Sequence, residues 1–332
     1  MSDIGRLAGV SAMTVSRVLR RPDAVSEAIR QRVLQIVKDL DYVPNVAAHG
    51  LSSQRSGFVA ALVPVMDSSN FADTARGLND VLEKNGLQLL LGFTEYSLHR
   101  EEQIITTMLL RRPEAIALIG GHHTERARRM LDRAGTVVVE MWELPSAPIE
   151  HVVGFSNFEA ARAMVRHLFD RGYRNIGFVG GATTRDKRGT LRRAGYSAAV
   201  EELGLPRGRV VTYGTPPIST TQGGEAFARL LARHPDIDAV MAVSDLSAFG
   251  VLSECQRRGL AVPDRMAVAG FGDFEIAATC HPRLTTVNVD SYGIGRRTGE
   301  LIVDVLDAKQ AGAAVSARTV TNDFTIIQRE TT

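Results

Sequence analysis

The chain has 332 residues, of which 44% are hydrophobic and 23% are charged, so it can bury more than one core and is not expected to be disordered. It contains no run of about 18 apolar residues, which excludes a membrane-spanning helix. Met1–Asp3 leads directly into a predicted helix without the charged and apolar regions of a secretion signal, so we expect a cytoplasmic protein.

The formal net charge of +2 is unevenly distributed along the chain. Residues 1–57 contain eight Lys or Arg and five Asp or Glu, whereas the remainder contains 31 and 32. The N-terminal segment is therefore the basic part. Because its excess is modest, tight binding to a polyanion would need two such segments acting together.

Residues 7–19 predict a helix, a tight turn and a second helix. Gly9 can adopt a positive φ, small Ala8 lets two helices approach, and Ser11 can cap the second helix. One side of that helix is an apolar stripe of Val15, Val18 and Leu19. The other side, with Met13, Ser16, Arg17 and Arg20, is left free for a DNA major groove.

A third helix is predicted from Ser26, with apolar residues through Leu40 at helical spacing. Helical hairpins with a glycine turn are common, but the third helix favours a helix-turn-helix headpiece over residues 1–45. Residues 46–57 read as a hinge helix and linker: 46–51 can form one or two helical turns, and a polar run follows. So short a helix is marginal in water, so we expect it to depend on a partner.

From Phe58 onward, strand-like and helical segments alternate. Apolar strand-like runs begin at Phe58, Leu87, Ala115, Thr136, Asn175, Arg209, Ala239 and Met266. Helices are predicted at 73–85, 98–111, 124–134, 157–172, 190–203, 221–234 and 245–259. This pattern predicts an α/β core of parallel sheets covered on both faces. Because it restarts near Gly154, we expect two doubly wound lobes in residues 58–332: about 58–153 plus 288–320, and about 154–287 plus 321–332.

In such lobes a ligand binds beyond the carboxyl ends of the strands, here in the cleft between lobes. Polar residues follow the strands at 67–71, 156–157, 183–192, 219, 244–245 and 272–273. The segment 183–188, with Arg192 and Arg193 one turn later, is dense in positive charge and could clamp a carboxylate or phosphate. The alternative is a solvated basic loop; the position at a strand end favours the anion site.

Nothing in the sequence predicts a catalytic or metal centre. No phosphate-binding glycine loop, nucleophile elbow, paired catalytic carboxylate motif or metal-ligand cluster is present, so we expect neither an enzyme nor a bound cofactor. Cys255 and Cys280 stand in no paired motif. His122 and His123 follow a strand end, but neighbouring side chains diverge and no further ligand stands at suitable spacing, so no metal is expected there.

Residues 3–51 resemble the headpiece and hinge of the lactose/galactose-repressor family of bacterial transcription regulators. The remaining chain resembles the same family, whose core has the fold of periplasmic sugar-binding proteins. Within the family, residues 154–164, 254–264 and 266–271 look most similar to gluconate-utilisation repressors. The resemblance implies a homodimer that binds a roughly palindromic operator, with the second helix of each headpiece in a major groove.

The resemblance also assigns DNA contacts. Ala12, Met13 and Arg17 match base-reading positions, Thr14 and Ser16 match phosphate-contacting positions, and Leu51 matches a hinge leucine that wedges into the minor groove. Arg17 could pair with a guanine edge, and Ala12 and Met13 could contact thymine methyl groups. Gly50 replaces a more usual small polar residue and weakens the predicted hinge helix.

For the cleft, the resemblance assigns effector contacts to Asn70, Phe71, Arg188, Arg192, Ser244 and Asp245. Gly272 stands where many relatives carry a ligand-binding aspartate, and Asp273, the next residue, is included as a candidate. Two arginines without that opposing carboxylate favour a sugar acid such as gluconate.

The function implied is a repressor of sugar or sugar-acid catabolic genes, relieved when a small-molecule effector shifts the lobes. The alternatives are a solute-binding protein for sugar uptake, which the basic headpiece opposes, and a sugar-modifying enzyme, which the lack of a catalytic motif opposes.

Overall fold

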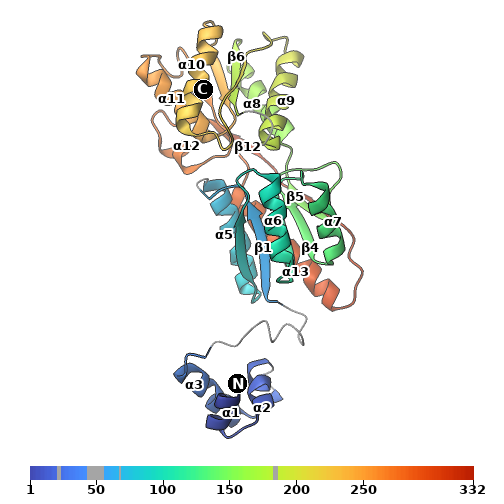
Figure 1. The fold of residues 1–332 in the computed structure, drawn as a ribbon. Helices are drawn as coiled ribbons and strands as arrows, with labels where there is room; N and C mark the ends of the chain where they lie inside the picture. Colours follow the sequence, from blue (N-terminus) through green and yellow to red (C-terminus); the bar gives the residue numbers. More distant parts are fainter. Residues whose placement is uncertain (21–23, 43–55, 67–68, 182–185) are drawn as a thin grey trace. The chain divides into compact units, whose positions relative to one another are not determined.

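A computed structural model describes residues 1–332 except 21–23, 43–55, 67–68 and 182–185. The chain divides into two compact units, Met1–Ser56 and Gly57–Thr332 (Figure 1). The predicted hinge helix at 46–51, with Leu51, and the basic residues 183–185 lie outside the described residues.

The first unit, the headpiece, contains three helices among its described residues. They are α1 (Ser2–Ala8), α2 (Ala12–Arg20) and α3 (Glu27–Asp39). Their shared core is formed by Ile4, Ala8, Val15, Val18 and Val33.

Two glycines set the turn between α1 and α2. Gly9 ends α1 with φ 66°, and a Cβ added at Gly5 would lie 2.7 Å from the carbonyl oxygen of Val10. Gly5 therefore lets the turn approach α1, a role that sequence reasoning gave only to Ala8. The predicted place of Leu40 on the α3 stripe is wrong, because α3 ends at Asp39 and Leu40 is 49% exposed.

The second unit, the core, holds two parallel sheets among its described residues, which confirms the predicted α/β fold class. The first sheet has the order β11-β5-β4-β3-β1-β2. Its strands are β1 (Phe58–Val63), β2 (Gln88–Phe93), β3 (Ala115–Ile119), β4 (Val137–Met141), β5 (His151–Gly154) and β11 (Thr319–Thr321). Its helices are α5 (Ser69–Lys84), α6 (Leu98–Leu109), α7 (Glu125–Ala134) and α13 (Ser291–Gln310). This sheet and its helices are the first lobe.

Both faces of the first sheet are buried because side chains alternate along each strand. On β1, Val59 and Ala61 belong to the cluster that contains apolar residues of α5 and α13. Ala60 and Leu62 belong to the cluster that contains residues of α6 and α7. This is why the strands of a doubly wound sheet appear in the sequence as continuous apolar runs.

The second lobe is built on the sheet β7-β6-β8-β9. Its strands are β6 (Ile176–Gly180), β7 (Val210–Thr212), β8 (Ala239–Ala242) and β9 (Ala267–Ala269). Its long helices are α8 (Asn157–Asp170), α9 (Lys187–Glu202), α10 (Thr220–Arg233) and α11 (Asp245–Arg257). Helix α9 begins three residues before its predicted start. This earlier start places Arg188 and Arg192 four residues apart on one helical face.

Short segments complete the second lobe. They are α12 (Glu275–Thr279) and an antiparallel pair formed by β10 (Thr286–Asn288) and β12 (Thr325–Ile327). Sequence reasoning did not predict β10, β11 or β12, because three-residue strands carry almost no periodic signal. In the part of the chain that the structure describes, no helix combines the length and the apolarity needed to cross a membrane.

His123 lies buried in the first lobe between two carboxylates. Its Nδ1 is 2.7 Å from Oε1 of Glu101, and its Nε2 is 3.3 Å from Oε1 of Glu140. The other oxygen of Glu140 accepts a hydrogen bond from the backbone N–H of Ile149. Burial alone lowers the pKa of His123, but the two carboxylates outweigh that effect and raise it to about 9. The described residues form no group of His, Cys, Asp and Glu suited to hold a metal ion.

The raised pKa of His123 makes the stability of the core depend on pH. Because the pKa is higher in the folded state, His123 stabilises the fold fully below pH 6.5 and loses this effect as the pH rises through about 9. We expect urea denaturation to show a loss of roughly 3 kcal/mol from this group over that range. His123→Gln should show a shallower dependence on pH than the wild type; parallel stability curves for the two proteins would contradict the assignment.

Candidate nucleic-acid interface and ligand cleft

The outward face of α2 presents the side chains that were predicted to contact DNA. Ala12, Met13 and Arg17 are exposed, Met13 by 71%, and Thr14 and Ser16 are half-buried. The opposite face of α2 is buried in the headpiece core. Leu51, the remaining predicted DNA contact, lies outside the described residues.

Local hydrogen bonds fix the start of α2. The backbone N–H of Thr14 donates to Oγ of Ser11 at 3.1 Å, and the two hydroxyl groups are 2.9 Å apart. Ser11 therefore acts as the predicted cap. Arg17 makes no hydrogen bond or ion pair with another described residue, so its guanidinium is available for the paired acceptors of a guanine edge.

The core contains two neighbouring cavities between its lobes. The smaller, which we term the arginine cavity, has a volume of about 70 Å³. It is lined by Val65, Asn70, Phe71, Tyr96, Trp142, Asp186, Arg188, Arg192, Pro217, Ile218, Val243, Ser244, Leu246, Phe271 and Phe274. The structure thus brings five of the seven predicted effector residues together.

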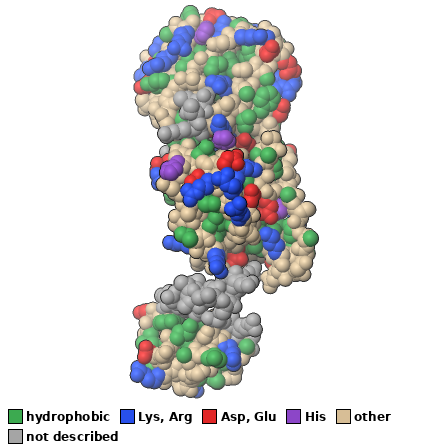
Figure 2. All heavy atoms as spheres, turned by 45° about the vertical axis from the view of Figure 1, so that its right-hand side comes forward, with side chains coloured by type: hydrophobic (Ala, Val, Ile, Leu, Met, Phe, Trp, Pro, Cys, Tyr) green, Lys and Arg blue, Asp and Glu red, His purple; other side chains and the backbone are tan. Residues whose placement is uncertain are grey.

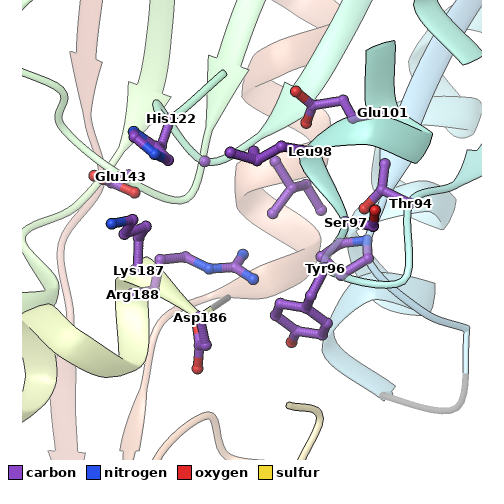
Figure 3. Close-up of a pocket in the computed structure, with 13 residues that line it drawn as sticks. Thr94, Tyr96, Ser97, Leu98, Glu101, His122, Glu143, Asp186, Lys187 and Arg188 are labelled. Carbon is purple, nitrogen blue, oxygen red and sulfur yellow. The ribbon is translucent and has the colours of Figure 1, made fainter. Parts of the chain in front are cut away.

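The larger cavity, which we term the Glu143 cavity, has a volume of about 180 Å³. It is lined by Pro64, Thr94, Tyr96, Ser97, Leu98, Glu101, Ile119, Gly120, His122, Glu143, Asp186, Lys187 and Arg188 (Figure 3). Tyr96, Asp186 and Arg188 line both cavities.

On the molecular surface, basic and acidic side chains gather on the first lobe in the face that Figure 2 shows.

Aromatic rings form a wall that runs from one lobe to the other. The rings of Phe71 and Trp142 meet edge to face at 5.3 Å, and those of Trp142 and Phe155 at 6.0 Å. The Phe155 ring in turn stacks on Phe271 at 6.3 Å. The polar groups of the arginine cavity therefore lie in an apolar, weakly screening setting, which strengthens any charge interaction made there.

Arg192 is held firmly in this setting. Its Nε donates to Oδ1 of Asn157 at 2.9 Å, its Nη1 donates to the carbonyl of Val243 at 2.8 Å, and its guanidinium lies 3.7 Å from the ring centroid of Phe271. Burial, with a smaller contribution from the charge of Arg188, lowers the pKa of Arg192 to about 10. The group remains protonated at neutral pH. Among the hydrogen bonds of the described residues, none uses its Nη2.

Arg188 makes fewer hydrogen bonds with the described residues than Arg192 does. It is only 7% exposed, and its Nη1 is buried without a hydrogen-bond partner in the described part of the chain. Its guanidinium lies 5.3 Å from the ring centroid of Phe71 and 5.8 Å from that of Tyr96. Cation–π contacts offset part of the cost of removing this charge from water, but they leave the donors of Arg188 unused.

Two predicted effector residues do not line either cavity. Asp245 is fully buried and accepts hydrogen bonds from Oγ1 of Thr286 at 2.6 Å and from the backbone N–H of Phe274 at 2.7 Å. Burial raises the pKa of Asp245 to about 6. Asp273 accepts from Nη2 of Arg329 at 2.6 Å and from Asn288 at 2.7 Å. Both carboxylates support the loop that carries Phe274, and an effector role for them stays a prediction.

The backbone conformation and the surroundings of residue 272 favour glycine over an aspartate. The φ of Gly272, 126°, is a conformation that other residues rarely adopt. An added Cβ would clash with the ring of Phe274 and lie 2.6 Å from Nδ2 of Asn70. An aspartate at this position would require the side chains of Phe274 and Asn70 to shift.

Sequence reasoning missed several cavity residues. Tyr96, Trp142 and Glu143 follow β2 and β4 directly, so the rule that polar and aromatic side chains at strand ends line the cleft could have found them. Phe271 follows β9 by two residues and could have been found by the same rule, whereas Phe274 lies farther into the loop and carries no such signal.

The headpiece and the core both match known families. A model of the bacterial regulatory proteins of the lacI family matches residues 1–45, and a model of the periplasmic binding protein-like domain matches residues 165–332. In sequence, the chain is 35% identical over 332 residues to the HTH-type transcriptional regulator GntR of Pseudomonas aeruginosa, covering 100% of this chain and 95% of that protein.

The chain is also similar to solved structures of transcriptional regulators. A LacI-family transcriptional regulator from Silicibacter pomeroyi has a TM-score of 0.90 and 34% identity, with 99% of this chain and 98% of that chain covered. The transcription regulator GntR of Chromobacterium violaceum has a TM-score of 0.75 and 33% identity, with 82% and 98% covered.

An exposed recognition helix joined in one chain to a two-lobed core with a central cleft defines a DNA-binding transcriptional regulator. The chain belongs to the lacI family of bacterial regulatory proteins. The predicted family is therefore confirmed.

Arg17 should carry much of the operator specificity. We expect Arg17→Ala to weaken binding to the operator by about 1–3 kcal/mol and to relax the base preference at one position of each half-site. Gel-shift titration against single-base operator variants measures both effects. Arg133→Ala, which removes an arginine from α7 of the core, is the control and should bind like the wild type. Equal losses in both variants would show that Arg17 supplies only general charge.

Proposed function

We propose that this chain is a homodimeric repressor of sugar-acid catabolic genes that binds a roughly palindromic operator and is released from it by a sugar acid such as gluconate. It acts by binding rather than by catalysis. Two headpieces are needed because the positive excess of one is too small for tight DNA binding.

The observation that carries the sugar-acid proposal is the state of Arg188. The residue is only 7% exposed, and its buried Nη1 has no hydrogen-bond partner among the described residues. A buried cation without a partner is costly, and a ligand carboxylate with two acceptor oxygens would offset that cost. Nη2 of Arg192 supports the same ligand from the next helical turn.

The charged and polar groups that line the arginine cavity also support an acidic ligand. Arg188 and Arg192 face one lining carboxylate, that of Asp186. The carboxylates of Asp245 and Asp273, which would repel an acid, are turned to other partners. Ser244 and Asn70 supply neutral groups for hydroxyls.

The placement of these residues supports a two-state mechanism. Asn70 and Phe71 belong to the first lobe, whereas Arg188, Arg192 and Ser244 belong to the second. An effector that contacts both sets binds most tightly to one relative position of the lobes and so shifts the population towards it. Coupling of about 1–3 kcal/mol would then suffice to lower operator affinity by roughly 5- to 150-fold.

A solute-binding protein for uptake is the weaker alternative, because a DNA-reading headpiece has no use in that role.

Arg188→Ala tests the sugar-acid proposal. We expect calorimetric titration to show gluconate binding weakened by about 10- to 150-fold, since a hydrogen bond to a charged group is worth about 1.5–3 kcal/mol. The ligand-free melting temperature should be unchanged or higher, because an unpaired buried charge is removed. Arg166→Ala on α8, which lines neither cavity, should bind gluconate like the wild type. A neutral hexose that binds better than gluconate and is insensitive to Arg188→Ala would overturn the proposal.

A further inference from the structure

Like Arg188, Glu143 is a charged residue near the cleft with a buried side-chain atom that lacks a hydrogen-bond partner in the part of the chain that the structure describes. It follows β4, and its Oε2 is buried without a hydrogen-bond partner among the described residues. Oε2 lies close to the backbone of Gly120, where an added Cβ would stand 3.8 Å away.

The two cavities adjoin along Arg188. Because Tyr96, Asp186 and Arg188 line both, a ligand held by Arg188 in the arginine cavity has the Glu143 cavity as its neighbouring space. In the view of Figure 3, Arg188 reaches across the cavity, with Glu143 and His122 on one side and Tyr96 and Ser97 on the other.

The charged groups that line the two neighbouring cavities differ. Two arginines and Asp186 line the arginine cavity. Lys187, His122, Glu143 and Glu101 are added in the Glu143 cavity. Glu101 is already paired with His123, and Lys187 and His122 are exposed, so water screens their charge. Of the carboxylates that line this cavity, Glu143 is the one with a buried oxygen that lacks a hydrogen-bond partner among the described residues.

We propose that the two cavities form one polarised site for an open-chain sugar acid with a single acid group, and that Glu143 is the residue that sets this specificity. The carboxylate lies at the arginine end, and the hydroxyl tail extends towards Glu143. A carboxylate accepts hydrogen bonds from hydroxyls but repels a second acid group at the far end of the ligand. This inference rests on the proposed sugar-acid function and adds the orientation of the ligand.

The test is the selectivity of the full chain, measured by calorimetry with gluconate, glucarate and 6-phosphogluconate. Glucarate and 6-phosphogluconate carry a second anionic group at the tail. We expect the wild type to prefer gluconate over each by about tenfold or more, since opposed like charges cost several kcal/mol before screening. Glu143→Gln should reduce this ratio to within about threefold of unity, because the amide keeps the shape and removes the charge.

Two control variants separate charge from structure. Glu143→Asp keeps the charge and should keep the preference, and Glu125→Gln on α7, outside both cavities, should leave it unchanged. Thermal melting checks that each variant folds; if Glu143→Gln does not fold, Glu143→Ala, which also removes the charge, is measured in its place and should likewise reduce the ratio.

The outcomes distinguish this inference from the proposed function. An unchanged ratio in Glu143→Gln, or wild-type binding of glucarate or 6-phosphogluconate as tight as that of gluconate, would overturn the role of Glu143 while leaving a sugar-acid effector in place. Absence of binding by all three acids would overturn the sugar-acid function itself and this inference with it.

Discussion

The buried charge of Arg188, whose Nη1 lacks a hydrogen-bond partner among the described residues, is the constraint on which the proposed ligand site depends. Helix α9 places it one turn before Arg192, and the aromatic wall keeps water away from both. Arg192 is satisfied by Asn157 and the carbonyl of Val243, whereas Arg188 has only the faces of two rings. In the proposed function an anionic ligand supplies the missing partner of Arg188, and its contacts with both lobes would couple occupancy to lobe position.

The same constraint accounts for the absence of a carboxylate at Gly272. An acidic side chain there would neutralise the arginines and would also force apart Asn70 and Phe274, between which the glycine lies. Asp273 stands one residue later but is bound by Arg329 and Asn288. Among the described residues that line the arginine cavity, only Asp186 carries a carboxylate, and we propose that the ligand carboxylate supplies a further counter-charge.

Patterns that are local in sequence could be predicted, and contacts between distant residues could not. The exposed face of α2 and the alternation of β1 follow from periodicity, and Arg188 and Arg192 follow from their position after a strand and from the family resemblance. The pairing of Asp273 with Arg329, 56 residues away, follows from no such rule, and neither does that of Asp245 with Thr286. Glu143 was missed because the polar residues that follow β4 were not included among the strand-end candidates.

A crystal structure of the full chain with gluconate tests the central claim most directly. The account predicts the ligand carboxylate within hydrogen-bond distance of Arg188 and Arg192, the hydroxyl tail directed towards Glu143, and contacts to both lobes. A carboxylate bound away from both arginines, or a ligand that touches one lobe only, would contradict it.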